Sequence, residues 1–253
     1  MIYYKKGAIK MGKVLACSDL HGRFDLFKSI QNFLQPDDIL YIIGDVIDRG
    51  PDGWKLFKEV MKDTRCKLLK GNHEDMCFKA MNDAKYGNYQ DNIPVWFNNG
   101  GDITFDQILA DEHGFSIYPL MGSLITQTEY INKDNIKIIL NHSGFYQDES
   151  FPREYDLLWD RIQYKTDFAK GWRGPEDVII VHGHTPIPLM IKDMQETAWL
   201  YQKEEPKYDC GAFWYADNHK INLDTGACWT GIAVMLDLDT FDEHIFQGEP
   251  MNG

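Results

Sequence analysis

Short apolar runs alternate with amphipathic stretches in the first third of the chain. The segments Lys13–Asp25, Asp37–Asp45 and Cys66–Glu74 each contain a continuous apolar run, which is typical of a strand buried on both faces. Helical spacing of apolar residues follows each run, from Phe24, from about Pro51 to Asp63, and again after the third run. This alternation of strands and helices predicts an α/β fold with a parallel sheet.

The alternation is interrupted and then resumes toward the C-terminus. Residues 84–130 are rich in Asn, Asp, Gly and aromatic residues before they become helical, which predicts a mostly helical insertion within a single domain spanning 1–253. Further strands are expected within Asn135–Phe145 and Asp177–Ile187. The Asp-Thr-Gly turn within His219–Leu238 predicts an antiparallel pair of strands. The expected architecture is two packed sheets flanked by helices.

The acidic composition narrows the classes of function. The chain has 253 residues, a formal net charge of −13 and 43% hydrophobic residues, which is enough apolar material for a folded core. The negative charge argues against a nucleic-acid-binding protein, because it would repel the phosphate backbone. A phosphorylated substrate remains possible, since a bound metal ion supplies local positive charge.

The cysteine content and the hydropathy of the chain indicate the cellular compartment in which we expect the protein. The five cysteines are odd in number and form no C-x-x-C motif, which argues against a disulfide framework or a thiolate zinc site. We find no signal peptide, and no run approaches the roughly 18 apolar residues of a membrane helix. We therefore expect a cytoplasmic protein with no membrane partner, while the oligomeric state stays open.

Polar side chains collect where the apolar strands end. Five predicted strands finish in Asp, His or Asn residues, and ligand sites of open α/β sheets lie at the carboxyl ends of the strands. We therefore expect these groups to meet at one rim. They are Asp19, His21, Asp45, Asp48, Arg49, Asn72, His73, His142, His182 and His184.

The chemical types in this set favour a metal site. Carboxylate, amide and imidazole groups suit manganese, iron or zinc better than calcium, which prefers oxygen ligands throughout. Even six of these groups are too many for one tetrahedral ion, and they fit two ions that share a bridging carboxylate.

Five sequence blocks carry a family resemblance. The blocks SDLHG, GDVIDRGP, GNHE, NHSGF and VHGHTP, in this order, resemble the signature of the calcineurin-like metallophosphoesterases, and the resemblance covers roughly residues 13–235. The GDVIDRGP form resembles the phosphoprotein phosphatase branch. The WFNNGGDITF and DLLWDR segments are similar to the serine/threonine phosphatases of bacteria and of bacteriophage lambda. The resemblance implies a four-layer α/β/β/α sandwich with two central mixed sheets.

The resemblance also implies a dinuclear metal centre. Asp19, His21 and Asp45 would hold the first ion, and Asp45 would bridge to the second. The complete set of implied ligands is Asp19, His21, Asp45, Asn72, His142 and His184. Two divalent ions, manganese first with iron or zinc as alternatives, would hold a hydroxide that attacks phosphorus.

Four further residues receive roles in the reaction by the same resemblance. His73 would protonate the leaving group as general acid, and Asp48 would orient it. Arg49 and Arg161 would bind the phosphate oxygens. His182 is hypothesised to lie in or beside the metal shell without binding an ion, because only the histidine before Thr-Pro aligns as a ligand.

Each of these residues also has a structural interpretation. Asp19 and His21 could form a helix-capping turn, and Asp45 and Asn72 are common turn-formers after strands. Arg49 could be a surface ion-pair partner, His73 and His142 could be structural histidines, and Arg161 could pair with Asp160 or Asp156. The ordered set of five blocks favours the functional interpretation. We interpret the aromatic residues as mainly core, and Asp224–Trp229 as a tight turn with Gly226 at a special backbone angle.

The predicted function is a metal-dependent phosphomonoesterase, specifically a serine/threonine protein phosphatase acting on a phosphorylated protein or a small phosphoester. The alternative is a diadenosine tetraphosphate hydrolase, which usually carries a different residue before the arginine at the position of Asp48. A nuclease is disfavoured by the acidic charge. A non-catalytic phosphate-binding module is disfavoured because no expected ligand is replaced.

Overall fold

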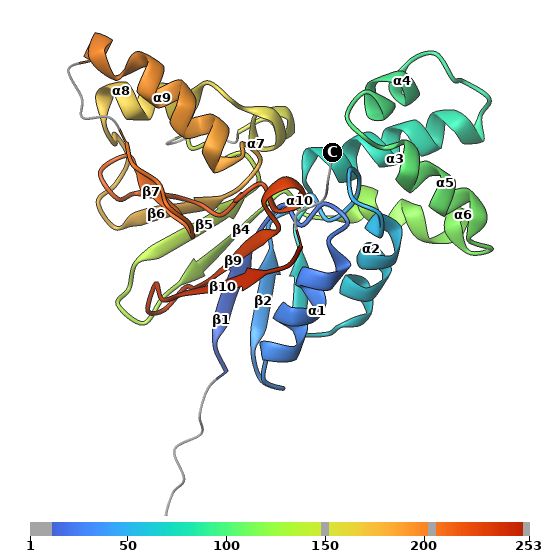
Figure 1. Ribbon diagram of the computed structural model, residues 1–253, viewed down its shortest axis with the longest axis horizontal. Helices are drawn as coiled ribbons and strands as arrows, with labels where there is room; N and C mark the ends of the chain where they lie inside the picture. Colours follow the sequence, from blue (N-terminus) through green and yellow to red (C-terminus); the bar gives the residue numbers. More distant parts are fainter. Residues whose placement is uncertain (1–11, 148–151, 202–205, 250–253) are drawn as a thin grey trace, which may run out of the picture.

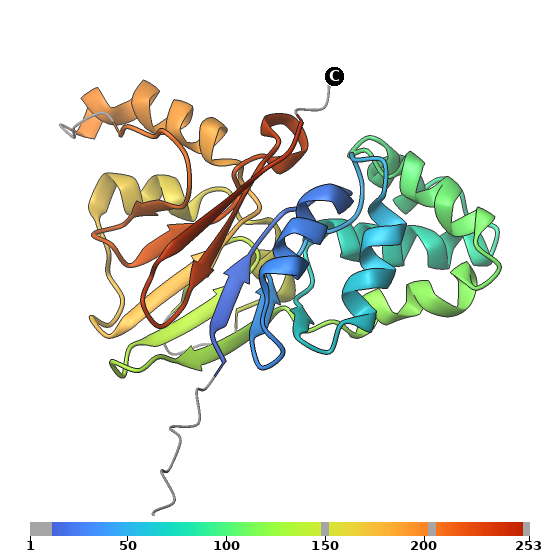
Figure 2. The ribbon, with the colours of Figure 1, turned by 60° about the horizontal axis from the view of Figure 1, so that its bottom comes forward.

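Two five-stranded sheets stack against each other, with helices on both outer faces (Figure 1). The computed structural model describes residues 12–147, 152–201 and 206–249. Figures 1 and 2 show α1 to α6 on the side of the first sheet and α7 to α9 on the side of the second. The predicted α/β architecture of two mixed sheets flanked by helices is therefore confirmed.

The first sheet has the order β10-β9-β1-β2-β3. β1 (Val14–Cys17), β2 (Ile39–Ile42) and β3 (Cys66–Leu68) are parallel to one another, with Val14 opposite Ile39. β9 (Ile232–Asp237) pairs antiparallel with β1, and β10 (Glu243–Gln247) closes the edge beside β9. The parallel strands are joined through α1 (Phe24–Phe33) and α2 (Gly53–Lys62), as the alternating pattern predicts.

The second sheet has the order β4-β5-β6-β8-β7. β5 (Lys137–Asn141), β6 (Val178–His182) and β8 (Lys220–Asn222) are parallel, while β4 (Gln127–Ile131) and β7 (Phe213–Tyr215) run antiparallel at the edges. The outer helices of this half are α7 (Glu154–Trp159), α8 (Gln163–Lys170) and α9 (Ile187–Tyr201).

Side-chain alternation along β1 and β2 builds two separate core layers. Leu15 and Cys17 pack toward the helices, whereas Ala16 faces the second sheet. Leu40 and Ile42 repeat the pattern on β2. Apolar side chains on both faces of a strand explain the unbroken apolar runs of the sequence. They also fix the register, because a slip of one residue would exchange the two faces.

Helical segments fill most of the region between β3 and β4. α3 (Asn72–Lys85) is followed by α4 (Asn92–Phe97), α5 (Asp102–Ala110), α6 (Gly114–Ile117) and a 3₁₀ helix, η1 (Tyr118–Ser123). The helical part begins earlier than the sequence suggests and ends before residue 130, because Gln127–Ile131 forms β4. This group of helices extends to one side of the first sheet (Figure 2).

The predicted strand pair within His219–Leu238 is wrong. β8 and β9 lie in different sheets, and the chain passes between them through α10 (Ala227–Thr230). Gly226 (φ 71°) and Gly231 (φ 70°) bracket α10 in the left-handed region, so the segment redirects the chain instead of reversing it. The apolar run of β9 is buried between β1 and β10, which a simple hairpin with β8 would not provide.

Within the described residues, no helix is long and apolar enough to cross a bilayer. The five cysteines all carry free thiols, and four of them are buried.

Candidate metal centre and active site

The loops that follow β1, β2, β3, β5 and β6 converge at the carboxyl edges of the two sheets. All six predicted metal ligands are at most 3% exposed: Asp19, His21, Asp45, Asn72, His142 and His184. Buried carboxylates and imidazoles are costly unless they are paired or bind a cation. The structure thus brings together side chains that lie more than 160 positions apart in the sequence.

Two groups of candidate ligands share one carboxylate. In one group, Asp45 lies with His142 and His184, and in the other it lies with His21 and His73. Asp45 Oδ2 is 3.3 Å from His142 Nε2, 3.7 Å from His21 Nε2 and 3.8 Å from His73 Nε2. A carboxylate between two imidazole clusters has the position that a bridging ligand requires.

The group around His142 requires a positive charge. His142 Nδ1 donates to the carbonyl oxygen of Ile43 (2.8 Å), so in the neutral ring Nε2 carries a lone pair. That atom faces Asn72 Oδ1 at 2.9 Å and Asp45 Oδ2 at 3.3 Å. Burial alone would lower the pKa of His142, but the charge of Asp45 raises this pKa to about 10. A proton or a divalent cation therefore satisfies the three converging acceptors, and the donor set fits a metal ion.

His184 completes this group from the loop after β6. Its Nδ1 lies 3.0 Å from Asn72 Oδ1. Its backbone N–H donates to both carboxylate oxygens of Asp19 (3.2 and 3.1 Å), so the loops after β6 and β1 are tied together. A side chain on Gly183 would place its Cβ 1.9 Å from Asp19 Oδ2, which explains the glycine in this position.

In the ligand group around His21, the structure and the sequence-based assignment differ in one residue. His21 directs Nδ1 at the carbonyl oxygen of Ile47 (2.9 Å), which leaves Nε2 facing Asp45. The third member by geometry is His73, whereas the resemblance assigns Asp19 to this ion. In the structure the Asp19 carboxylate is hydrogen-bonded to Ser18 and to the backbone of His184.

The predicted acid pair is present as a buried contact. His73 Nδ1 lies 2.7 Å from Asp48 Oδ2, and both side chains are fully buried. Burial raises the pKa of Asp48, although the hydrogen bond from His73 opposes this effect. The arrangement leaves His73 Nε2 facing Arg49 (3.0 Å) and Asp45 (3.8 Å).

Two arginines contact histidines of the two ligand groups. Arg49 donates to His21 Nε2 (2.9 Å) and lies 3.0 Å from His73 Nε2. Arg161, in the segment after α7, donates from Nε to His184 Nε2 (3.0 Å). Guanidinium groups beside both candidate ligand groups are suited to binding a tetrahedral oxyanion.

The backbone of the site is strained. Asp45 (φ 55°), Asp48 (φ 67°) and Arg49 (φ 63°) occupy the left-handed region within one loop. Three more site residues share this conformation: Asp19, His21 and His184. Such conformations cost about 1 to 3 kcal/mol each and persist only where neighbouring contacts enforce them.

Glu74 supplies such contacts, and the sequence analysis did not assign it a role. Its carboxylate is fully buried and accepts the backbone N–H groups of Asp45 (2.8 Å), Val46 (2.9 Å) and Gly71 (2.9 Å). Burial and the charge of Asp45 raise the pKa of Glu74 to about 7. The available signal was a Glu three residues after Gly71, the reciprocal position of a helix capping box.

Two further residues were assigned only structural roles from the sequence. Trp96 is fully buried, as expected for a core residue, but its indole N–H donates to Asp48 Oδ2 (2.7 Å). Asp224 belongs to the predicted tight turn, and it accepts the N–H of Gly226 (2.9 Å). Burial raises the pKa of Asp224 to about 6, and after burial its negative charge is the largest influence raising the pKa of Asp19.

His182 lies outside both ligand groups. It donates from Nδ1 to the carbonyl oxygen of Gly183 (3.0 Å) and accepts at Nε2 from the Tyr215 hydroxyl (2.8 Å). Both ring nitrogens are therefore engaged within the second sheet.

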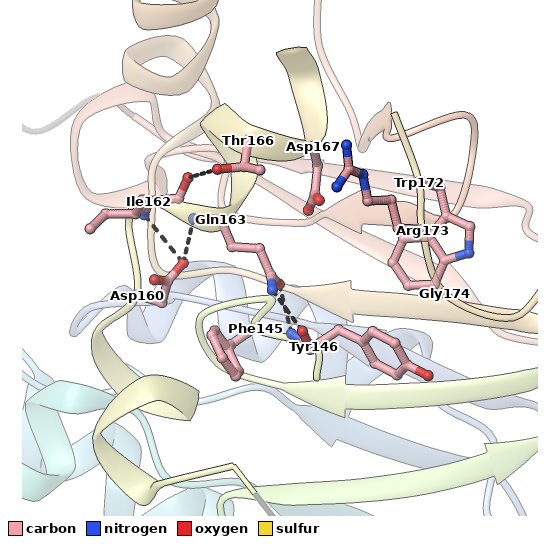
Figure 3. A pocket seen from close by; sticks show the side chains of 10 residues that line it. All are labelled: Phe145, Tyr146, Asp160, Ile162, Gln163, Thr166, Asp167, Trp172, Arg173 and Gly174. Carbon is pink, nitrogen blue, oxygen red and sulfur yellow. Dashed lines mark hydrogen bonds between the residues drawn. The ribbon is translucent and has the colours of Figure 1, made fainter. Parts of the chain in front are cut away.

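A pocket of about 390 Å³ lies between α8 and the loop after β5 (Figure 3). Asp160 and Ile162, the neighbours of Arg161 in the chain, form part of its wall, and Tyr146 and Trp172 contribute aromatic surface. Gln163 bonds both backbone groups of Tyr146 (2.7 and 2.6 Å), as Figure 3 shows, and so fixes this wall.

The fold and the shared-carboxylate centre define a metallophosphoesterase, and sequence comparison gives the family. The family model described as calcineurin-like phosphoesterase matches residues 12–221, so the chain belongs to this family. Divalent metal ions are the cofactors of this family, and its members are hydrolases.

The proteins that are similar in sequence to this chain include two kinds of phosphoesterase. The chain is 29% identical over 170 residues to serine/threonine-protein phosphatase 2 of Escherichia coli, covering 64% of this chain and 74% of the relative. It is also 29% identical over 132 residues to a symmetrical bis(5'-nucleosyl)-tetraphosphatase of Buchnera aphidicola, covering 50% of this chain and 42% of the relative. A solved structure described as a candidate diadenosine tetraphosphatase has a TM-score of 0.59 at 16% identity. The match covers 97% of this chain and 96% of that one, and it supports the fold alone.

Proposed function

We propose that this phosphoesterase is a serine/threonine protein phosphatase with two divalent metal ions. The observation that carries the proposal is the position of Asp45 between two imidazole clusters, with a guanidinium group on each side. Manganese is the proposed metal, with iron or zinc as alternatives, because Asp, Asn and His side chains suit all three. We further propose that the protein acts in the cytoplasm.

Six side chains would hold the two ions. Following the family resemblance, we assign Asp19, His21 and Asp45 to the first ion, although His73 is the third group beside His21 and Asp45 in the structure. We assign Asp45 with Asn72, His142 and His184 to the second ion. When bound, the ions would supply an activated water nucleophile and neutralise charge on the phosphate oxygens.

The two arginines would bind and orient the phosphate group. Arg49 and Arg161 now donate to imidazole nitrogens at the rim, and these bonds would be exchanged for bonds to phosphate oxygens. A guanidinium can hold two oxygens at once, which fixes both the position and the rotation of the phosphate. The phosphorus would then face the metal centre.

His73 would give a proton to the departing oxygen of the ester. An alkoxide is a poor leaving group, so proton donation matters most for phosphoserine and phosphothreonine. Asp48, 2.7 Å from Nδ1, would keep the ring oriented so that Nε2 can donate to the departing oxygen.

The second candidate is a bis(5'-nucleosyl)-tetraphosphatase, the name carried by several relatives. The serine/threonine phosphatase is favoured because the relative with that name is matched over a larger part of both chains. The aromatic wall of the pocket between α8 and the loop after β5 would suit a peptide side chain or a nucleobase, so it does not separate the two.

The test compares phosphate release from a phosphothreonine peptide and from diadenosine tetraphosphate by metal-stripped protein, with and without added manganese. The proposal expects manganese-dependent release from the peptide at a much higher kcat/KM than from the dinucleotide. A preference for the dinucleotide would establish the second candidate. Hydrolysis of neither, with metal bound, would overturn both.

A further inference from the structure

The orientation of Asp48 depends on one of its two carboxylate oxygens. Asp48 is completely buried, and among the described residues its Oδ1 has no hydrogen-bond partner. Oδ2 has two close partners, His73 Nδ1 at 2.7 Å and the indole nitrogen of Trp96 at 2.7 Å. Trp96 is therefore a second donor to the oxygen that faces His73, and the Thr104 side chain adds a further hydrogen bond to this carboxylate.

The segment around Trp96 also holds the backbone of this loop. The N–H of Asp48 donates to Thr104 Oγ1 (3.1 Å), and the N–H of Arg49 donates to the carbonyl oxygen of Gly100 (2.9 Å). Both loop residues are in the left-handed region, which requires such external support. The segment from α4 to α5 thus binds the Asp48–Arg49 pair through Trp96, Gly100 and Thr104.

The indole itself is fixed by close packing. Trp96 is fully buried, and Gly101 lies against its ring. A Cβ on Gly101 would lie 2.2 Å from the indole nitrogen, so any side chain there would displace the ring. The glycine keeps the N–H directed at Asp48.

We propose that Trp96 is a positioning residue for proton donation by His73, acting through Asp48. This inference rests on the proposed phosphatase mechanism and extends it to the helical region between β3 and β4. Trp96 fixes the carboxylate, the carboxylate fixes the imidazole, and the imidazole must point Nε2 at the leaving oxygen to transfer its proton. Without the indole N–H, Asp48 Oδ2 keeps only its contact with His73, so the carboxylate and the imidazole are held less rigidly.

The test exploits the difference between good and poor leaving groups. p-Nitrophenolate departs without much help from an acid, whereas the alkoxide of a phosphothreonine peptide needs a proton. We expect Trp96→Phe to lower kcat for the peptide by roughly 10- to 100-fold, within the range of general acid catalysis. For p-nitrophenyl phosphate we expect a change of less than about threefold, with KM unchanged for both substrates.

Two other variants serve as references for the effect of Trp96→Phe. His73→Asn should show the same preference for the good leaving group, and adding Trp96→Phe to it should have little further effect. Trp54→Phe is the matched control, because Trp54 is also buried and donates its indole N–H to a carboxylate, that of Asp111 (2.8 Å). It should leave both activities near those of the wild type.

The outcomes separate this inference from the function on which it rests. Equal losses on both substrates in Trp96→Phe, or no loss, would overturn the positioning role if His73→Asn still discriminates. Wild-type protein that hydrolyses neither substrate, or His73→Asn that does not discriminate, would overturn the phosphatase mechanism and the inference together. If Trp96→Phe does not fold, Gly101→Ala provides the second variant, since it displaces the indole and should give the same discrimination.

Discussion

Glu74 Oε2 lies 2.8 Å from the backbone nitrogen of Asp45, so a side chain of α3 holds the loop that follows β2. The same carboxylate accepts the N–H groups of Val46 and Gly71. The residue at the centre of both ligand groups therefore depends on an acid that binds no metal. Its role is to stabilise a left-handed backbone at Asp45.

Replacing this acid with its amide should damage the fold and the metal centre together. Glu74→Gln exchanges one acceptor for an NH₂ group that would face a backbone N–H, so at least one bond is lost. We expect the free energy of unfolding to fall by about 2 kcal/mol, measured by urea denaturation, and the manganese affinity to fall in a metal titration. The control is Glu129→Gln, an exposed partner of Lys137 (2.9 Å), which should change stability by less than about 0.5 kcal/mol. Unchanged metal affinity in Glu74→Gln would contradict the supporting role.

The two histidines of the His182-Gly183-His184 segment should behave differently. His182 is engaged by Gly183 and Tyr215, whereas His184 faces Asn72. We expect His182→Gln to bind as many manganese ions as the wild type, and His184→Gln to lose one, as counted by elemental analysis after dialysis. Loss of an ion in His182→Gln would show that the assignment of the two histidines is wrong.

Arg161 should contribute to substrate binding through its charge. Arg161→Ala removes a donor from the rim beside His184, so KM for p-nitrophenyl phosphate should rise by roughly 10-fold, the value of one charge-assisted hydrogen bond. Arg153→Ala is the control, because Arg153 is exposed and paired with Asp156 (2.8 Å). Equal steady-state parameters for Arg161→Ala and the control would exclude the phosphate-binding role.

Asp63 gives a pH-dependent contribution to stability far from the site. The Arg65 guanidinium, at 2.9 and 2.6 Å, holds the pKa of Asp63 well below its usual range, with help from Gln31. Because the unfolded pKa is about 3.9, the contribution is complete above that pH and is lost as the pH falls toward the folded value. Asp63→Asn should therefore lower the free energy of unfolding by about 1 to 2 kcal/mol at pH 7.

This difference from the wild type should shrink as denaturation is measured at decreasing pH below about 4. Asp52→Asn removes an exposed pair with Lys55 (3.7 Å) and should have almost no effect at either pH. If the difference in unfolding free energy between Asp63→Asn and the wild type did not depend on pH, the stabilising ion pair between Asp63 and Arg65 would be contradicted.

The two sheets and the polar residues at their carboxyl edges could be predicted because both depend on local sequence patterns. Unbroken apolar runs identify strands covered on both faces, and the polar residues after them must meet where parallel strands end. The assignment of β8 and β9 failed because an Asp-Thr-Gly signal is local, whereas the partner of β9 is chosen by burial between β1 and β10. Gly226 lets the chain turn into α10 and is not part of a hairpin.

Glu74 and Trp96 were missed for a different reason. Each acts through a hydrogen bond to a residue 29 or 48 positions away, and no spacing rule connects such pairs. A buried Trp has the same hydropathy whether or not its N–H has a functional partner. The strained backbone of Asp45, Asp48 and Arg49 is equally invisible in the sequence, because these residue types show no requirement for a left-handed conformation.

The most direct test of the shared-carboxylate centre is to count manganese ions bound per chain at equilibrium, in the wild type and in Asp45→Asn. The amide keeps the size of the side chain but loses the charge that would bridge two cations. We predict two ions per chain for the wild type and at most one, bound more weakly, for Asp45→Asn. A wild type that binds no metal, or an Asp45→Asn variant that keeps both ions at unchanged affinity, would contradict the account.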